Sequence, residues 1–114
     1  MHELGIMTGV IHSVEEVAKQ NNAREVLLIK MSIGEMTEAM EDALQFAFEV
    51  ASIDTLCEGA KLEVNIIAPK SRCDECGLEF EHNRFIRTCP ECDSLATTLL
   101  SGREMQIDSI EIDN

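Results

Sequence analysis

Two stretches of the chain place apolar residues at helical spacing. The first runs from Ile6 to Lys19, and the Asn21-Asn22 pair that follows is a natural stop for a helix. Its predicted apolar stripe comprises Ile6, Val10, Val14 and Val17, with Met7, Ile11 and Ala18 beside it. A second helix is predicted from Thr37, which would act as its N-cap. Its predicted apolar side comprises Met40, Ala43, Leu44, Ala47, Phe48 and Ala51.

Three other stretches alternate apolar and polar residues and predict strands over residues 24–33, 61–67 and 105–112. In the first, one face is expected to carry Leu27, Ile29, Met31 and Ile33. The last stretch changes parity between Ile107 and Ile110, so we predict a bulge near Ser109 that keeps its apolar residues buried, Met105 among them. This order of elements predicts an α+β fold, with a small mixed sheet packed against two helices.

The charge balance narrows the classes of partner. The 114 residues include 22 acidic and 9 basic side chains, giving a formal net charge of −13. Such a chain repels phosphate backbones, so we expect no nucleic-acid partner. No apolar run approaches the ~20 residues that span a bilayer, and no signal peptide is visible. We therefore expect a cytoplasmic protein without membrane contact.

The five cysteines supply the clearest chemical signal. Four form two pairs, Cys73-x2-Cys76 and Cys89-x2-Cys92, in a segment without apolar periodicity. Two residues between the cysteines of each pair let a tight turn aim both thiolates at one point, and four thiolates are typical of a closed, structural zinc site. Iron remains open from the ligands alone, and a redox dithiol would need only one pair. We expect an inserted zinc-ribbon-like module with four cysteine ligands at residues 70–102, with the α/β part formed by residues 1–69 and 103–114.

Three further side chains carry weaker chemical signals. His82 is either an additional zinc ligand or, as we favour, an exposed histidine. Cys57 lies outside the pairs and is interpreted as a small buried hydrophobic residue. His12, in the middle of the first helix, is interpreted as an ordinary half-exposed residue.

The sequence begins Met1-His2-Glu3, which has metal-binding chemistry of its own. With a free amino group on Met1, that amine and the His2 amide nitrogen close a five-membered chelate ring. The His2 amide and its Nδ1 close a six-membered ring, so three nitrogens surround the ion in a plane. Deprotonated amides suit square-planar Ni(II) or Cu(II) better than Zn(II). A frayed terminus without metal is the alternative.

Taken together, the Met-His-Glu start, Ile33-Gly34-Glu35 and the late cysteine pairs make the chain resemble the HypA/HybF family of hydrogenase nickel-incorporation proteins. The resemblance implies a nickel metallochaperone that binds Ni(II) through Met1, His2 and Glu3. It implies structural Zn(II) held by Cys73, Cys76, Cys89 and Cys92. It also implies delivery to the [NiFe]-hydrogenase large subunit together with a nickel-handling GTPase accessory protein. Service to urease and a homodimer both remain open.

Two other functions compete with this hypothesis. One is a zinc-ribbon protein-interaction module that never handles nickel. The other is a metalloenzyme with His2, Glu3 and Glu35 around a catalytic ion, but no nucleophile–base pair or substrate-anchoring motif accompanies these residues. We therefore expect no enzymatic activity.

Overall fold

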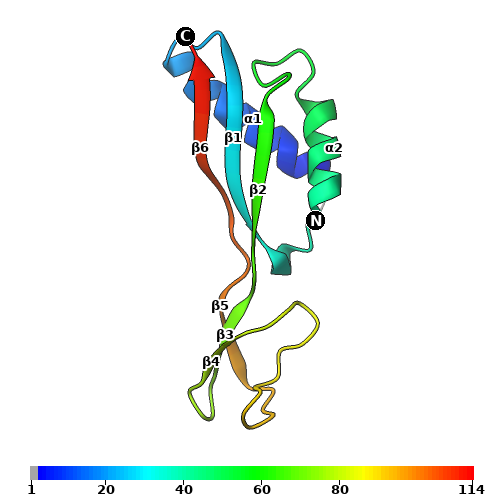
Figure 1. Ribbon diagram of the computed structural model, residues 1–114, viewed down its shortest axis with the longest axis vertical. Coiled ribbons are helices and arrows are strands. Elements are labelled where there is room, and N and C mark those ends of the chain that lie inside the picture. The colour runs from blue at the N-terminus through cyan, green and yellow to red at the C-terminus, as the bar shows by residue number, and fades with distance from the viewer. Residues whose placement is uncertain (1–2) are drawn as a thin grey trace.

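The computed structural model describes residues 3–114. It is elongated, measuring 55 × 24 × 16 Å, and contains two three-stranded sheets. Its elements are α1 (Glu3–Gln20), β1 (Glu25–Gly34), η1 (Glu35–Thr37), α2 (Glu41–Ala51), β2 (Lys61–Ile67), β3 (Lys70–Cys73), β4 (Glu79–Glu81), β5 (Thr97–Ser101) and β6 (Met105–Asp113). Figure 1 shows the larger sheet with its helices above the smaller sheet. The expected α+β class is confirmed.

The larger sheet has the strand order β2-β1-β6, with β1 parallel to β2 and antiparallel to β6. It is therefore mixed, as predicted. The helices α1 and α2 share one apolar core with it, to which β1 contributes Ile29, Met31 and Ile33. Among the described residues, neither helix combines the length and apolar character that crossing a membrane requires.

The α1 helix begins three residues before the predicted start and ends at the predicted Asn pair, where Asn22 adopts a φ of 57°. Most of its predicted stripe is buried, but Val17 is 46% exposed. Ala18, rather than Val17, is the next buried residue after Val14, because the buried residues Ile6, Val10, Val14 and Ala18 are spaced four positions apart.

The predicted N-cap of the second helix is wrong. Residues 35–37 form a separate 3₁₀ turn, and the Thr37 hydroxyl donates to the Gly34 carbonyl at 2.8 Å. The turn ends at Glu38 with a φ of 65°, and α2 starts only after Met40, which has no side-chain cap. Met40 is also 55% exposed, which removes it from the predicted apolar side.

Two irregularities in the pairing of β1 with β6 decide which side chains are buried. Val26 pairs with Ile112 and Leu28 with Glu111, which leaves Leu27 without a partner and 45% exposed rather than buried. Farther along, Lys30 pairs with Ser109 and Met31 with Ile107. Asp108 is therefore the extra residue, which confirms the bulge predicted near Ser109.

The bulge does not bury the first part of β6, contrary to the prediction. Met105 and Ile107 are 40% and 37% exposed. They line an open groove against Gly5 and Gly9 of α1. Because glycine has no side chain, the helix does not reach far enough to cover them.

The smaller sheet has the order β4-β3-β5, with both neighbours antiparallel to β3. The sequence pattern did not predict these strands. They are short, and most of their side chains are not buried, so no alternation appears in the sequence. The two sheets meet where β1 ends: Gly34 donates to the Glu104 carbonyl at 2.7 Å, and Met36 donates to the Gly102 carbonyl at 2.8 Å.

Candidate metal sites

The first cysteine pair lies in a tight turn at the end of β3. The carbonyl of Cys73 accepts the N–H of Gly77 at 2.9 Å, and the N–H of Cys73 donates to the carbonyl of Leu78 at 2.8 Å. The N–H of Cys76 donates to the Cys73 sulfur at 3.4 Å. Gly77 closes the turn with a φ of +79°, a conformation that glycine adopts without steric cost.

The second pair repeats this turn without a glycine. The carbonyl of Cys89 accepts the N–H of Asp93 at 2.9 Å, and the N–H of Cys89 donates to the carbonyl of Ser94 at 3.0 Å. Asp93 has a φ of 58° and therefore occupies the place of Gly77. Aspartate is among the few other residues that adopt this conformation readily. This role of Asp93 was not predicted, although Asp93 and Gly77 each follow the first cysteine of their pair by four residues.

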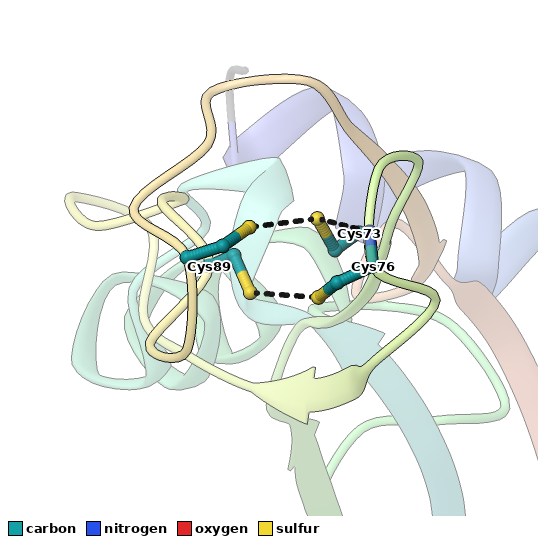
Figure 2. A group of neighbouring side chains, drawn as sticks. Cys73, Cys76 and Cys89 are labelled. Atoms are coloured by element: carbon teal, nitrogen blue, oxygen red, sulfur yellow. Dashed lines mark hydrogen bonds between the residues drawn. The ribbon is translucent and has the colours of Figure 1, made fainter.

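The two turns bring the four thiols together. Figure 2 shows their sulfurs directed toward a common centre. The sulfurs of Cys73 and Cys92 are 3.6 Å apart, those of Cys76 and Cys89 are 3.5 Å apart, and all four lie within 4.8 Å of one another. Zinc–sulfur bonds of about 2.3 Å in a tetrahedron require sulfur–sulfur separations of about 3.8 Å. The cluster therefore fits a tetrahedral metal site.

Burial and charge support the same interpretation. The first cysteine of each pair is buried, the second is exposed, and all five cysteines of the chain are free thiols. The N–H of Cys76 lowers the pKa of Cys73 to about 7, outweighing burial. The pKa of Cys92 instead rises to about 12: the N–H of Ser94 lowers it, but the Cys73 sulfur, desolvation and the other thiols outweigh that effect. Four neighbouring thiolates repel one another, and a bound cation removes this conflict.

The residues predicted to bind nickel are described only in part, because Met1 and His2 lie outside the described residues. Glu3 is the first residue of α1, and its carboxylate lies 3.5 Å from the backbone nitrogen of Met40. The N-terminal ends of α1 and α2 are therefore neighbours.

Glu35, a candidate ligand in the metalloenzyme hypothesis, is engaged in a backbone contact. Its Oε2 accepts the backbone N–H of Arg84 at 2.9 Å, which joins η1 to the loop before the second cysteine pair. This contact gives Glu35 a structural role. Sequence reasoning could not find it, because the two residues are 49 positions apart.

His12, His82 and the fifth cysteine, Cys57, lie outside the thiol cluster. The Nδ1 of His82 donates to the Asn83 carbonyl at 2.7 Å, and its Nε2 accepts from the buried Ser71 hydroxyl at 2.7 Å. His82 is therefore half-buried and held by hydrogen bonds, rather than exposed. His12 lies 3.4 Å from Glu16 and is largely exposed, beyond the half-exposure expected. Cys57 is buried as predicted, and its pKa is raised to about 11, chiefly by desolvation and then by Glu15.

Comparisons with known proteins agree over nearly the whole chain. Residues 1–112 match the family model described as "Hydrogenase/urease nickel incorporation, metallochaperone, hypA". The chain is 37% identical to the hydrogenase maturation factor HypA of Desulfitobacterium hafniense DCB-2, over 99% of each protein. It is 38% identical to the HypA of Methanococcus aeolicus, over 94% of this chain and 93% of that protein. The solution structure of the nickel metallochaperone HypA from Helicobacter pylori matches with a TM-score of 0.69 and 28% identity, covering 99% of this chain and 98% of the other.

Proposed function

This chain belongs to the HypA family of nickel metallochaperones for hydrogenase maturation, and on that premise we propose that it binds Ni(II) at its N-terminus and delivers it to a [NiFe]-hydrogenase. The match over residues 1–112 carries the proposal, because it includes both Met1-His2-Glu3 and the four cysteines. The thiol cluster alone would suit equally well a protein that binds no nickel.

We assign structural Zn(II) to the cluster of Cys73, Cys76, Cys89 and Cys92. The donor set supports this assignment, since four thiolates at tetrahedral separations suit Zn(II) and leave no open position for a substrate. The ion would supply folding free energy on the order of 10 kcal/mol to a segment with few buried apolar side chains. Residues 70–102 then form a zinc-binding module, and residues 1–69 with 103–114 form the nickel-binding part.

Nickel is the cargo, and we assign it to Met1, His2 and Glu3. The start of α1 suits this chemistry in two ways. The first four N–H groups of a helix have no intrahelical acceptor, so coordination through the Glu3 amide breaks no helical hydrogen bond. The N-terminal end of the helix dipole also favours negative charge, which includes deprotonated amide nitrogens.

The expected partners are the hydrogenase large subunit and a nickel-handling GTPase accessory protein. Urease remains a second recipient under this proposal, since the family description names it. We place the protein in the cytoplasm, where thiolate ligands remain reduced. Delivery involves no bond-making catalysis by the chain, so the proposal assigns it no enzymatic activity.

Nickel titration of the zinc-loaded chain tests the proposal. A copy with a free Met1 amine should develop the absorption band of planar, low-spin Ni(II), and His2→Ala should abolish the band while leaving zinc content unchanged. A copy whose Met1 amine is acetylated should also lack the band, because the five-membered chelate ring that starts at this amine can no longer form. His12→Ala is the matched control and should bind nickel normally.

The competing interaction-module function makes the opposite prediction. It requires weak nickel binding that is equal in the free and the acetylated copy, and that result would remove the nickel assignment. The zinc assignment would survive it, since metal analysis and the fold of residues 70–102 are measured separately. Nickel affinity should also rise with pH, because the amine, amides and imidazole release protons on binding.

A further inference from the structure

The loop between β4 and the second cysteine pair exposes an apolar and basic surface. We call residues 83–87 the tip loop; its sequence is Asn-Arg-Phe-Ile-Arg. Phe85 is 79% exposed and Ile86 is 56% exposed, in a chain with only four phenylalanines. The loop contains two arginines and no acidic residue, so all 22 acidic residues of the chain lie outside it.

The backbone of the tip loop is fixed although these side chains are exposed. The Asn83 Oδ1 accepts the N–H groups of both Phe85 and Ile86, at 2.8 and 2.9 Å. The His82 Nδ1 donates to the carbonyl of Asn83 at 2.7 Å. These bonds come from within the loop and from the residue immediately before it.

Two more bonds anchor the loop from outside. Glu35 accepts the N–H of Arg84, and the Thr97 hydroxyl donates to the carbonyl of Arg87 at 3.3 Å. Hydrogen bonds from His82, Glu35 and Thr97 therefore hold the backbone of a loop whose large apolar side chains are mostly exposed. Such a loop loses little conformational entropy when a partner binds it.

The arrangement of the side chains indicates the chemistry of that partner. The Arg84 guanidinium lies over the Phe85 ring, 4.9 Å from its centre, and a guanidinium stacked in this way can still bind a carboxylate through its edge. Exposed aromatic and arginine side chains on a fixed backbone are typical of residues that dominate binding energy. A matching partner presents carboxylates next to an apolar side chain.

We propose that the tip loop is a docking site for an acidic segment of another protein, which contacts Arg84, Phe85, Ile86 and Arg87. Nucleic acid is the weaker candidate, because a long phosphate backbone would also meet the repulsion of a chain with net charge −13. A short acidic peptide segment would contact the tip loop alone and would therefore avoid most of this repulsion. The proposal does not depend on nickel, since no tip-loop residue belongs to either assigned metal site.

The test uses the zinc-loaded full chain and a short synthetic peptide of glutamate and leucine. Titration monitored by ¹H–¹⁵N NMR should shift the amides of residues 83–87 and leave those of α1 unchanged. Phe85→Ser and Arg87→Glu should each weaken binding at least about tenfold. The matched controls are Phe46→Ser, which also truncates an exposed phenylalanine, and Lys19→Glu, which makes the same charge change; both should bind as the unaltered chain does.

Three results would overturn the proposal. The first is equal weakening by the controls and the tip-loop variants, which would indicate nonspecific binding. The second is tighter binding of oligothymidylate than of the peptide at the same loop, which would indicate a nucleic-acid site. The third is a concentration-dependent dimer abolished by Phe85→Ser, which would identify a second copy of the chain as the occupant.

Variants of Glu35 test separately whether the fixed backbone of the tip loop contributes to peptide binding. Glu35→Ala should speed hydrogen exchange at the Arg84 amide and weaken peptide binding, with zinc content unchanged. Glu35→Gln should restore both, because its amide oxygen can accept the same N–H. Unchanged peptide affinity in Glu35→Ala would contradict the argument that a fixed backbone underlies binding.

Discussion

Replacing Gly34 by alanine tests the close contact between the two sheets. A Cβ atom at this position would lie 2.0 Å from the carbonyl oxygen of Gly102, whereas real Cβ contacts essentially never fall below 3.0 Å. The backbone around Gly102 would have to move by about 1 Å or more. That shift would disrupt two hydrogen bonds, from Gly34 to Glu104 and from Met36 to Gly102.

Each of these bonds contributes about 1 kcal/mol, and overpacking adds about 1–3 kcal/mol, so Gly34→Ala should lower the free energy of unfolding by about 3–5 kcal/mol. At roughly 4–5 °C per kcal/mol for a domain of this size, the Tm should fall by roughly 12–25 °C. Thermal unfolding of the zinc-loaded chain, followed by circular dichroism, measures both quantities. Gly9→Ala is the matched control: nothing lies within 4 Å of its Cβ, so it should stabilise α1 by about 0.5–1 kcal/mol. A loss below about 1 kcal/mol in Gly34→Ala would refute the close contact.

Three further predictions concern the cysteines and the turn around them. Asp93→Gly should keep full zinc affinity, whereas Asp93→Val should lower it roughly tenfold in a chelator competition, because the left-handed conformation costs about 1–2 kcal/mol for such a residue. Cys89→Ala should remove zinc and collapse the amide dispersion of residues 70–102 while leaving α1 and β1 folded, as NMR would show. In the zinc-loaded chain, burial and Glu15 raise the pKa of Cys57 to about 11, so its thiol should resist iodoacetamide at neutral pH and react only after the chain is unfolded, as mass spectrometry can determine.

The elements with regular apolar spacing could be predicted from the sequence, and so could one irregularity. The parity change between Ile107 and Ile110 located the bulge, because a strand with one buried face must reverse its alternation there. The exposure of Leu27 could not be predicted in the same way. Its own stretch alternates regularly, and its displacement appears only in the register with β6.

The start of α2 shows a different limit. Threonine is a common N-cap residue, but the Thr37 hydroxyl donates to the Gly34 carbonyl instead of capping α2. Glu38 then adopts a left-handed backbone conformation, which ends the 3₁₀ turn before α2 begins. The backbone nitrogen of Met40 instead lies beside the carboxylate of Glu3, from the other helix. A contact between residues 37 positions apart leaves no local signal.

The candidate zinc site could be predicted nearly completely, because the spacing of the four cysteines determines the two turns. Its supporting residues could not. His82 is a plausible ligand by type, but its two ring nitrogens are engaged by Ser71 and Asn83. Only the folded sheet reveals that this histidine satisfies a buried hydroxyl rather than a metal.

The two proposed metals make opposite demands on their protein donors. A resident ion needs donors that cannot dissociate one at a time. The thiol cluster meets this need, because each of its two hydrogen-bonded turns holds two of the four sulfur donors in place. A cargo ion needs donors that a recipient can replace in sequence, and the proposed donors Met1, His2 and Glu3 are three consecutive residues. The junction between them is short: Glu3 lies against Met40, and η1, just before Met40, carries the Glu35 that anchors the tip loop. Figure 1 shows η1 between the larger sheet and the smaller one. Under the proposed function, a partner bound at the tip loop would therefore be connected to the Glu3 contact through η1, the turn that carries Glu35 and precedes Met40.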